Sequence, residues 1–424
     1  MKRYSEYKDS GVKWIGEIPG HWNAVSLKRV VKLINEKSNE QNIPYIALEN
    51  IESFTGKILP LNEIEPDSIC NKFKKDDVLF CKLRPYLTKC VSPSFDGKCT
   101  SELLVLRNFN GVANYLKYTL LSPRLVMDIN ASTYGAKMPR ANWNYIGLCR
   151  VPLPPLPEQE AIVTYLDSKV AKIDEYISIA EKKIAALEEL KQTIIAEAVT
   201  RGIHKDVPMK DSGVKWIGMI PEHWKIMRLR FVCEFRNGYT PSKANPKFWE
   251  NGTIPWFRME DIRDSGRFLN EAKQYISKEA VKGDGLFEAG SFILATTATI
   301  GEHAMLIADS LANQQFTNLK IRKSLISKLS RNFFFYYLFV IDEYCKSTTR
   351  KATFPSVDMT DLKNIGVSIP PIEEQQEIVT YLDSKVANIN QLCQAERSQI
   401  EKLKEYKQRL ISDVVTGKVK VTND

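Results

Sequence analysis

The chain contains the stretch PPLPEQE at residues 154–160 and a second copy, PPIEEQQ, at residues 370–376. Both copies lead into the same run, IVTYLDSKVA, at residues 162–171 and 378–387. A stretch that returns almost unchanged in one chain indicates an internal duplication. We therefore expect two similar halves, each ending in the segment that follows these prolines.

A long helix is predicted after each proline-rich stretch. Prolines interrupt the chain up to Pro157, Glu158 places an acid in the first helical turn, and no helix breaker follows until Gly202. Apolar residues recur at steps of three and four, which is typical of a coiled coil. Lys191, Glu396 and Lys407 interrupt this seam. Its apolar positions are Leu166, Val170, Ile173, Ile177, Ile184 and Leu187 in the first copy and Leu382, Val386, Ile389, Ile400, Leu403 and Leu410 in the second.

Such amphipathic helices need a partner, and the chain carries two matching ones. We expect them to pair with each other as an antiparallel coiled coil of roughly 65 Å, with the mixed domains at opposite ends and a pseudo-twofold relation between the halves. Ile162, Ile195 and Ile378 flank the seam and could offer a second face to another protein.

A second duplicated segment, here called the clasp, occupies residues 8–22 and returns at residues 210–224. Its tryptophans, glycines and proline predict an irregular segment pinned by buried aromatic rings. Each copy holds one histidine, His21 or His223. The sequence places no carboxylate or cysteine partner for either, so we expect a structural role rather than a catalytic one.

The regions between the clasp and the long helices read as mixed strands and short helices. The predicted strand at residues 78–81 runs into the basic and aromatic loop 82–89, and its counterpart at 292–295 runs into the hydroxyl-rich loop 296–301. The two equivalent strands thus lead into loops of different chemistry. Loops on a rigid frame commonly bind ligands. Ordinary drift of surface loops after the duplication is the alternative.

Further strands are predicted at 43–51, 103–106, 254–262 and 317–321, and short helices at 115–121 and 333–341. The sequence separation between matching residues of the two halves grows across this region. It is smaller for the pair Trp14 and Trp216 than for the pair Pro139 and Pro355. From there the spacing is constant, so the insertions fall in loops, where they cost little.

Composition limits the classes of function. The 424 residues carry a net charge of +9, with a pI of about 8.9, which suggests an anionic partner such as nucleic acid. The eight cysteines form no C-x-x-C pair and no zinc spacing, and fit a reducing cytoplasm better than a disulfide scaffold. The amino terminus does not read as a signal peptide. The longest apolar run, 333–341, is too short to span a bilayer.

Catalytic patterns are largely missing. The sequence has no Walker A stretch, no G-x-G-x-x-G and no Asp/Asn-Pro-Pro-Tyr/Phe of amino-methyltransferases. Asp261 or Asp264 upstream of Glu271-Ala272-Lys273 resembles a nuclease pattern, but it has no counterpart in the first half. We therefore expect no active centre, no metal site and no cofactor in this chain.

The duplicated junction and clasp, together with TATIG at 297–301 and NQQF at 313–316, closely resemble the specificity subunits of type I restriction-modification systems. The resemblance covers essentially the whole chain. It implies an α+β fold with two target recognition domains, at 1–156 and 203–372, and two spacer helices, at 157–202 and 373–424. The first half departs from the pattern because it has Leu83-Arg84-Pro85-Tyr86 in place of a TATIG loop, so the two domains should read different half-sites.

The resemblance also implies partners. Double-stranded DNA would be bound at a split, asymmetric sequence, the helices would set the spacer and dock two methyltransferase subunits, and restriction subunits would join the complex. S-adenosylmethionine, ATP and magnesium would belong to those partners. The chain itself would be a non-catalytic subunit in the cytoplasm.

DNA contacts are expected from loop side chains that can reach phosphates or base edges. The candidates are Lys82, Arg84, Tyr86, Lys89, Lys137, Arg140 and Asn142 in the first domain and Asn237, Thr240, Lys243, Thr296, Thr297, Thr299, Arg350 and Lys351 in the second. For each of them, an ordinary solvated surface position is the alternative. Two other functions stay open: a coiled-coil interaction scaffold without DNA binding, and a stand-alone magnesium-dependent nuclease that uses Glu271.

Overall fold

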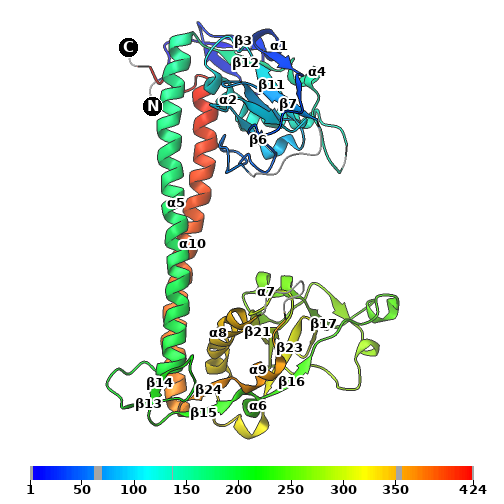
Figure 1. Cartoon of the computed structure of the whole chain (residues 1–424), viewed down its shortest axis with the longest axis vertical. Helices are drawn as coiled ribbons and strands as arrows, with labels where there is room; N and C mark the ends of the chain where they lie inside the picture. Colours follow the sequence, from blue (N-terminus) through cyan, green and yellow to red (C-terminus); the bar gives the residue numbers. More distant parts are fainter. Residues whose placement is uncertain (1–2, 62–68, 136, 350–355, 423–424) are drawn as a thin grey trace. The chain divides into compact units, whose positions relative to one another are not determined.

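The computed structural model describes residues 3–61, 69–135, 137–349 and 356–422. The chain forms two compact units, Met1–Lys182 with Glu396–Asp424, and Lys183–Ala395. Both long helices, α5 (Leu156–Arg201) and α10 (Ile372–Val415), contribute to both units (Figure 1). The four consecutive segments expected from the sequence stay a prediction.

The first unit contains two four-stranded sheets. One has the order β4-β11-β8-β9 and the other β5-β7-β10-β6. The strands of the first sheet are β4 (Lys32–Ile34), β11 (Leu103–Arg107), β8 (Val78–Cys81) and β9 (Cys90–Val91). Those of the second are β5 (Lys37–Ser38), β7 (Cys70–Phe73), β10 (Gly97–Cys99) and β6 (Tyr45–Ile46). The remaining elements are β1 (Tyr7–Asp9), β2 (Glu17–Pro19), β3 (Asn23–Ser26), α1 (Leu27–Val30), η1 (Pro85–Leu87), α2 (Ala113–Leu120), α3 (Pro123–Ala131), α4 (Trp143–Ile146) and β12 (Arg150–Leu153).

The second unit contains a five-stranded sheet, β16-β23-β20-β21-β18, and a three-stranded sheet, β19-β17-β22. Their strands are β16 (Cys233–Asn237), β23 (Phe316–Ile321), β20 (Phe292–Ala295), β21 (His303–Leu306), β18 (Phe268–Leu269), β19 (Tyr275–Ile276), β17 (Ile254–Phe257) and β22 (Leu311–Ala312). The remaining elements are β13 (Met209–Asp211), β14 (Met219–Pro221), β15 (Lys225–Arg228), α6 (Leu229–Val232), η2 (Pro246–Phe248), α7 (Met259–Ser265), η3 (Lys278–Ala280), η4 (Lys323–Leu325), α8 (Arg331–Thr348), α9 (Met359–Asn364) and β24 (Gly366–Ile369).

The duplication is visible in the strand order. The order β4-β11-β8-β9 in the first unit corresponds to β16-β23-β20-β21 in the second, and both sets are antiparallel throughout. A parallel pair recurs as well, β6 with β10 and β17 with β22. The expected α+β class, with two similar mixed domains and two long helices, is confirmed.

The expected strands at 43–51 and 254–262 are shorter than predicted. In the first unit only β6 forms within that range. In the second, β17 ends at Phe257 and α7 begins two residues later, because Asp261 accepts a hydrogen bond from the backbone of Arg258 and caps the new helix. A local cap of this kind competes with strand extension.

The helix pairs are antiparallel within each unit. In the first unit the beginning of α5 packs against the end of α10, with Leu166, Val170 and Leu410 in one apolar cluster. In the second unit Ile195 near the end of α5 clusters with Leu382 near the start of α10. The expected seam positions are all buried or half-buried, from Leu166, which has no exposed surface, to Ile184 and Leu187, which are partly exposed.

No helix in the described part of the chain is long and apolar enough to cross a membrane. The apolar run at 333–341 lies in α8, where Phe333, Phe334 and Tyr337 are buried in the core of the second unit. This agrees with the expected buried helix.

Candidate nucleic-acid interface

The two duplicated sequences meet at the start of each long helix. Glu158 of α5 accepts hydrogen bonds from Tyr4 Oη at 2.8 Å and from Trp22 Nε1 at 3.1 Å, and His21 Nε2 lies 2.5 Å from its other oxygen. Glu374 of α10 repeats this with Trp224 Nε1 at 3.0 Å and His223 Nε2 at 2.8 Å. The clasp is therefore fastened to the helix that follows its own domain.

The expectation that the clasp histidines lack a carboxylate partner is wrong. Each pairs with the glutamate of the proline-rich junction, and more than a hundred residues separate the two along the chain. Sequence proximity gave no hint of the contact. Since the carboxylate also binds a buried tryptophan, the pair reads as an anchor, which agrees with the structural role expected for the clasp.

The neighbouring glutamine ties the helix to its globular domain. Gln159 is buried, accepts from Val112 N at 3.0 Å and donates to the Pro154 carbonyl at 2.9 Å. Gln375 accepts from Ser330 N at 2.7 Å and donates to the carbonyls of Lys328 and Pro370, both at 2.8 Å. The Glu-Gln dipeptide thus joins clasp, domain and helix in each half.

In the first unit, backbone hydrogen bonds bring two candidate loops together. Arg84 N donates to the Pro139 carbonyl at 2.7 Å, and Ala141 N donates to the Lys82 carbonyl at 2.9 Å. The loop after β8 and the loop before α4 therefore form one surface, which unites Lys82 and Arg84 with Lys137. The sequence did not predict this contact.

Arg84 is held in an unusual conformation. Its φ of 48° lies in the left-handed region, as does the φ of 49° at Thr88, and η1 spans the residues between them. Bulky residues adopt this conformation only where the surrounding structure requires it, and such residues gather at functional sites. The side chains of Arg84 and Tyr86 are exposed. Among described residues, Lys82, Arg84 and Lys137 have no carboxylate within ion-pair distance.

Three other candidates in this unit are engaged by the protein itself. Lys89 Nζ donates to the Leu48 carbonyl at 2.6 Å, Arg140 forms an ion pair with Glu102 at 3.0 Å, and the Asn142 side chain caps α4 through Asn144 N. These contacts position the loops. Lys89 and Arg140 are therefore weaker candidates for DNA contact than the sequence suggested.

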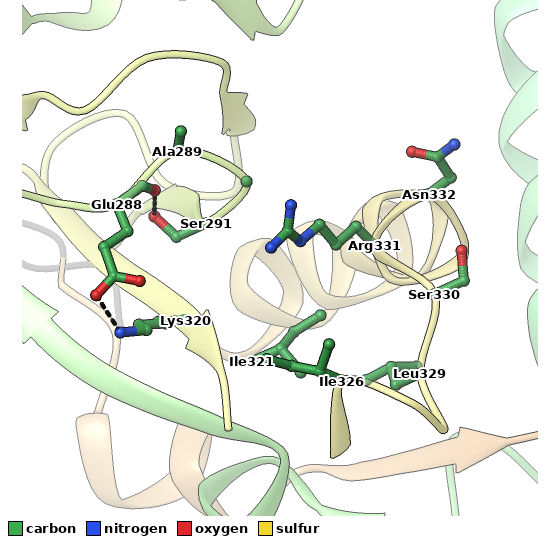
Figure 2. A pocket seen from close by; sticks show the side chains of 11 residues that line it. Glu288, Ala289, Ser291, Lys320, Ile321, Ile326, Leu329, Ser330, Arg331 and Asn332 are labelled. Atoms are coloured by element: carbon green, nitrogen blue, oxygen red, sulfur yellow. Dashed lines mark hydrogen bonds and ion pairs between the residues drawn. The ribbon is translucent and has the colours of Figure 1, made fainter. Parts of the chain in front are cut away.

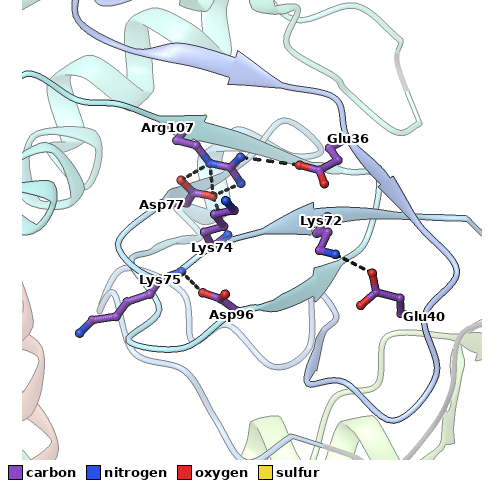
Figure 3. A network of polar contacts seen from close by, with 8 residues as sticks. All are labelled: Glu36, Glu40, Lys72, Lys74, Lys75, Asp77, Asp96 and Arg107. Carbon is purple, nitrogen blue, oxygen red and sulfur yellow. Dashed lines mark hydrogen bonds and ion pairs between the residues drawn. The ribbon is translucent and has the colours of Figure 1, made fainter.

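A neighbouring group of charges provides a contrast. Lys72 pairs with Glu40 at 2.5 Å, and Arg107 pairs with the buried Asp77 at 2.8 Å (Figure 3). The Asp77 and Asp96 carboxylates also accept from the backbone amides of Lys74 and Lys75. Lys72 and Arg107 are thus paired with carboxylates, as Arg140 is, whereas Lys82 and Arg84 of the candidate loop are not.

In the second unit, three segments converge on the end of β20. Thr296 N donates to the Gln315 carbonyl at 2.9 Å, and Val357 N donates to the Thr296 carbonyl at 2.9 Å. Gly238 N donates to the Phe316 carbonyl at 2.8 Å. A Cβ at Gly238 would lie 2.1 Å from the Asn313 carbonyl oxygen, so only glycine allows this close approach.

The hydroxyl-rich loop is divided into buried and accessible parts. Thr296 is buried and its hydroxyl lies 3.0 Å from that of Thr317, which donates to the exposed Asn237 at 3.2 Å. Thr296 is therefore unsuited to direct DNA contact, because its hydroxyl is used inside the sheet. Thr297 and Thr299 are partly exposed, and Ala298 between them has a φ of 62°.

Thr240 and Lys243 lie on the adjoining loop, Thr240 partly exposed and Lys243 exposed. The Thr240 hydroxyl donates to the side chain of Gln314, an exposed residue that was not among the candidates. The NQQF stretch was noticed in the sequence, but only the fold places Gln314 on this surface. Arg350 and Lys351 lie outside the described residues.

The nuclease pattern does not form a site. Asp261 is buried; one of its oxygens accepts from Arg258 N at 2.7 Å and caps α7, and the other accepts from Lys273 N at 2.9 Å in the loop that follows β18. Lys273 instead pairs with Asp264 at 2.5 Å, and hydrogen bonding to that carboxylate raises the pKa of Lys273. The resemblance to a nuclease therefore reflects capping of α7.

A cavity of about 330 Å³ beside the start of α8 contains Glu288, which is paired with Lys320, and the exposed Arg331 (Figure 2). In the described ranges, no three His, Cys, Asp or Glu side chains gather to hold a metal ion. All eight cysteines are buried thiols outside any disulfide, and burial raises the pKa of Cys81 to about 11.

Comparison with known proteins gives consistent matches. Residues 221–402 match the family model for the type I restriction modification DNA specificity domain. The EcoprrI type I restriction enzyme specificity subunit of Escherichia coli is 45% identical over 159 residues, which cover 36% of this chain and 40% of that protein. The putative MjaX specificity subunit of Methanocaldococcus jannaschii is 25% identical over 438 residues, which cover 98% of each.

Solved structures share the fold. A structure from work on complex assembly and conformational transition of the type I R-M system matches with a TM-score of 0.72 and 22% identity, over 94% of this chain and 98% of that one. The HsdS subunit of Thermoanaerobacter tengcongensis matches with a TM-score of 0.50 and 23% identity, over 95% and 98%.

Proposed function

Because the chain belongs to the family of type I restriction-modification specificity subunits, we propose that it reads a bipartite, asymmetric DNA target and directs methyltransferase and restriction subunits to it. It would do so as a non-catalytic subunit. The neighbouring subunits would supply S-adenosylmethionine, ATP and magnesium, and the assembly would work in the cytoplasm.

One observation carries the proposal for two half-sites. The equivalent strands β8 and β20 occupy the same place in their sheets, yet β8 leads into the cationic loop with Arg84 and β20 into the hydroxyl-rich loop with Thr297 and Thr299. A common scaffold with two different loops suits two different base sequences. Arginine favours guanine, asparagine favours adenine, and threonine can bond to different bases.

In the first half, Lys82, Arg84 and Lys137 would supply charge, and Tyr86 an exposed aromatic ring. In the second half, the corresponding surface would be lined by Asn237, Thr240, Lys243, Thr297 and Thr299, together with Gln314. The candidates Arg350 and Lys351 stay predictions from the sequence alone. An interaction scaffold without DNA binding, or a stand-alone nuclease, has no support in the family matches.

The long helices would dock the methyltransferase subunits. Exposed apolar side chains occur at equivalent places in the two copies: Tyr176 and Leu392 are 63% and 49% exposed, and Leu190 and Tyr406 are 49% and 45% exposed. Each unit contains one residue of each pair. Exposed apolar groups at matched positions suit two copies of one partner.

Methylation mapping tests the reading function directly. The chain is expressed with a methyltransferase partner in a host, and modified bases are mapped across the genome. We expect one split, asymmetric motif that disappears when the chain is left out. Methylation without a motif, or a motif independent of this chain, would refute the proposal.

Docking has a separate test. Tyr176→Lys and Leu392→Lys should each weaken capture of the methyltransferase, because each places a charge on an apolar surface, and the double variant should lose both copies. Lys172→Glu, at an exposed position of the same helix, serves as the control. Full assembly of the double variant would contradict this docking surface.

A further inference from the structure

A cluster of three polar side chains lies between the five-stranded sheet and α8. His303, the first residue of β21, is fully buried, and its Nδ1 lies 2.6 Å from Asp342 Oδ2 on α8. Arg267 Nη1 donates to the same oxygen at 3.2 Å and to the His303 carbonyl at 3.1 Å. The rings of Phe335 and Phe339 enclose the imidazole, with centroids 5.0 and 4.6 Å away.

The common scaffold does not require this cluster. Leu294 of β20 pairs with His303, and in the first unit the corresponding pair is Phe80 of β8 with Cys90. Cys90 is fully buried, so the same place in the fold is filled there by a small apolar side chain. Burying charged groups is costly and often no more stabilising than apolar packing. The cluster is therefore a specialisation of the second half.

Its position links it to loop 296–301. Ala295 N donates to the Glu302 carbonyl at 2.8 Å and Gly301 N donates to the Ala295 carbonyl at 3.1 Å, which closes the base of the loop directly before His303. Gly301 has a φ of +73°, and a Cβ there would lie 2.5 Å from the Asp342 carbonyl oxygen. The end of the loop thus packs on the turn of α8 that carries Asp342.

The start of loop 296–301 is held by residues 356 and 357. Val357 N donates to the Thr296 carbonyl, and Thr297 forms a bridge with Ser356, in the segment that follows α8. A shift of α8 against the sheet would therefore act on the end of loop 296–301, where Gly301 packs on Asp342. His303, Asp342 and Arg267 join α8 to the sheet next to this contact.

We propose that His303, Asp342 and Arg267 are positioning residues that hold loop 296–301 in the conformation that reads the second half-site. They act through Gly301 and do not contact DNA themselves. Because the first half lacks the cluster, their influence is confined to one half of the target. This inference rests on the proposed function.

The test measures discrimination at each half-site separately. His303→Gln and Asp342→Asn are made in the full chain and assembled with the methyltransferase. Binding is then compared on the mapped target and on duplexes with single substitutions in either half. We expect discrimination at the second half-site to fall about tenfold, as for loss of one good base contact, and discrimination at the first to stay unchanged.

Cys90→Ala, at the equivalent place in the first unit, is the matched control and should leave the second half-site unaffected. Should the buried variants fold poorly, Arg267→Lys changes a partly exposed member of the cluster and gives the same readout. Melting temperatures of all variants separate loss of structure from loss of reading.

Intact discrimination in well-folded variants, or an equal loss at both half-sites, would overturn the positioning role. A wild-type complex without preference at either half-site would instead refute the proposed function and this inference with it. The two failures are therefore distinguishable in one experiment.

Discussion

Lys407 of α10 reaches into the seam of the first unit, where its Nζ lies 2.7 Å from Asp174 Oδ1 of α5. Lys191 of α5 lies 3.2 Å from Asn390 Oδ1 of α10 in the second unit. Lys191 and Lys407 occupy equivalent places after the two proline-rich junctions, as do Asp174 and Asn390. Each helix thus contributes one lysine that contacts a polar side chain of the other helix. The two contacts lie at equivalent positions of the antiparallel pair.

These contacts explain the interruptions of the seam. Polar residues at buried coiled-coil positions commonly specify register at some expense of stability. Asp174 also pairs with Lys57 at 2.7 Å, so it links the helices to a loop of the globular domain. The lysines appeared as exceptions in the apolar pattern, and the fold shows that they have partners.

Replacement of Lys407 by methionine should destabilise the first unit. Asp174 would keep only the half-exposed Lys57, and we expect a loss of about 3 kcal/mol, typical of breaking a buried pair. The double variant Lys407→Met, Asp174→Leu should recover most of this loss, because no buried charge stays unpaired. Thermal unfolding of the four members of the double-mutant cycle measures the coupling, and additive effects would contradict the buried pair.

Arg84→Ala should lower DNA affinity by about 1–3 kcal/mol and relax the preference at one base pair of the first half-site. Binding of the assembled complex to a panel of substituted duplexes measures both effects. Lys72→Ala is the control, because Lys72 is paired with Glu40 in the same domain. A uniform loss over all sequences, with a shallower salt dependence, would identify Arg84 as a phosphate contact instead.

Gln375→Ala should destabilise the second unit by about 1–3 kcal/mol, because the buried Pro370 carbonyl loses its hydrogen-bond partner. The substitution would remove the hydrogen-bond partner of Ser330 N and of the carbonyls of Lys328 and Pro370. The next residue offers a matched control, since Gln376 is exposed and Gln376→Ala should have little effect. Equal melting temperatures for the two variants would show that the junction glutamine is dispensable.

Acidification should destabilise the second unit through His303. Burial lowers the pKa of His303 below its usual value of 6.5, although the neighbouring Asp342 opposes this and Arg267 reinforces it. The folded state therefore binds fewer protons than the unfolded state, so stability falls as the pH drops through about 6.5 and below. Melting temperatures between about pH 8 and pH 5 measure the effect.

In this pH series, His303→Gln should flatten the acid side of the profile. His204→Gln is the control, because His204 lies exposed on the same unit. An identical acid slope for wild type and His303→Gln would show that other groups govern the acid sensitivity.

Insertion of one heptad into α5 alone, between the lysine contacts, should disrupt the pairing or change the preferred spacer of the DNA target. The insertion keeps the apolar seam in phase but moves Lys191 relative to Asn390 by two helical turns. Methylation mapping gives the spacer, and gel filtration gives the assembly. An unchanged spacer with intact assembly would argue against the helices as a ruler.

Much of the scaffold could be predicted from local pattern. The strands at 78–81 and 292–295 form as expected, because short apolar runs end there at polar loops. The strand expected at 254–262 was cut short by a cap that the sequence also contains. That cap was missed because Arg258 is an uncommon cap residue and Asp261 had a competing interpretation as an acid of a nuclease.

The candidate site was predicted less well. Arg84 and Lys137 are exposed and stay predictions, whereas Thr296 is buried and Lys89 and Arg140 are engaged by the protein itself. Gln314 lies beside Thr240, but nothing local in the sequence distinguishes it from any surface glutamine. Side-chain direction at the end of a strand depends on which segments pack there, and that is not written in the neighbouring residues.

The sequence by itself determined the duplication, the two long helices and the difference between the two loops, because repeats and periodicity are properties of residue order. Only the tertiary structure decided that His21 meets Glu158, that Lys407 meets Asp174, and that the 82–89 and 134–142 loops form one surface. These contacts join residues far apart in the chain, and their energy depends on distance and burial rather than on sequence neighbours.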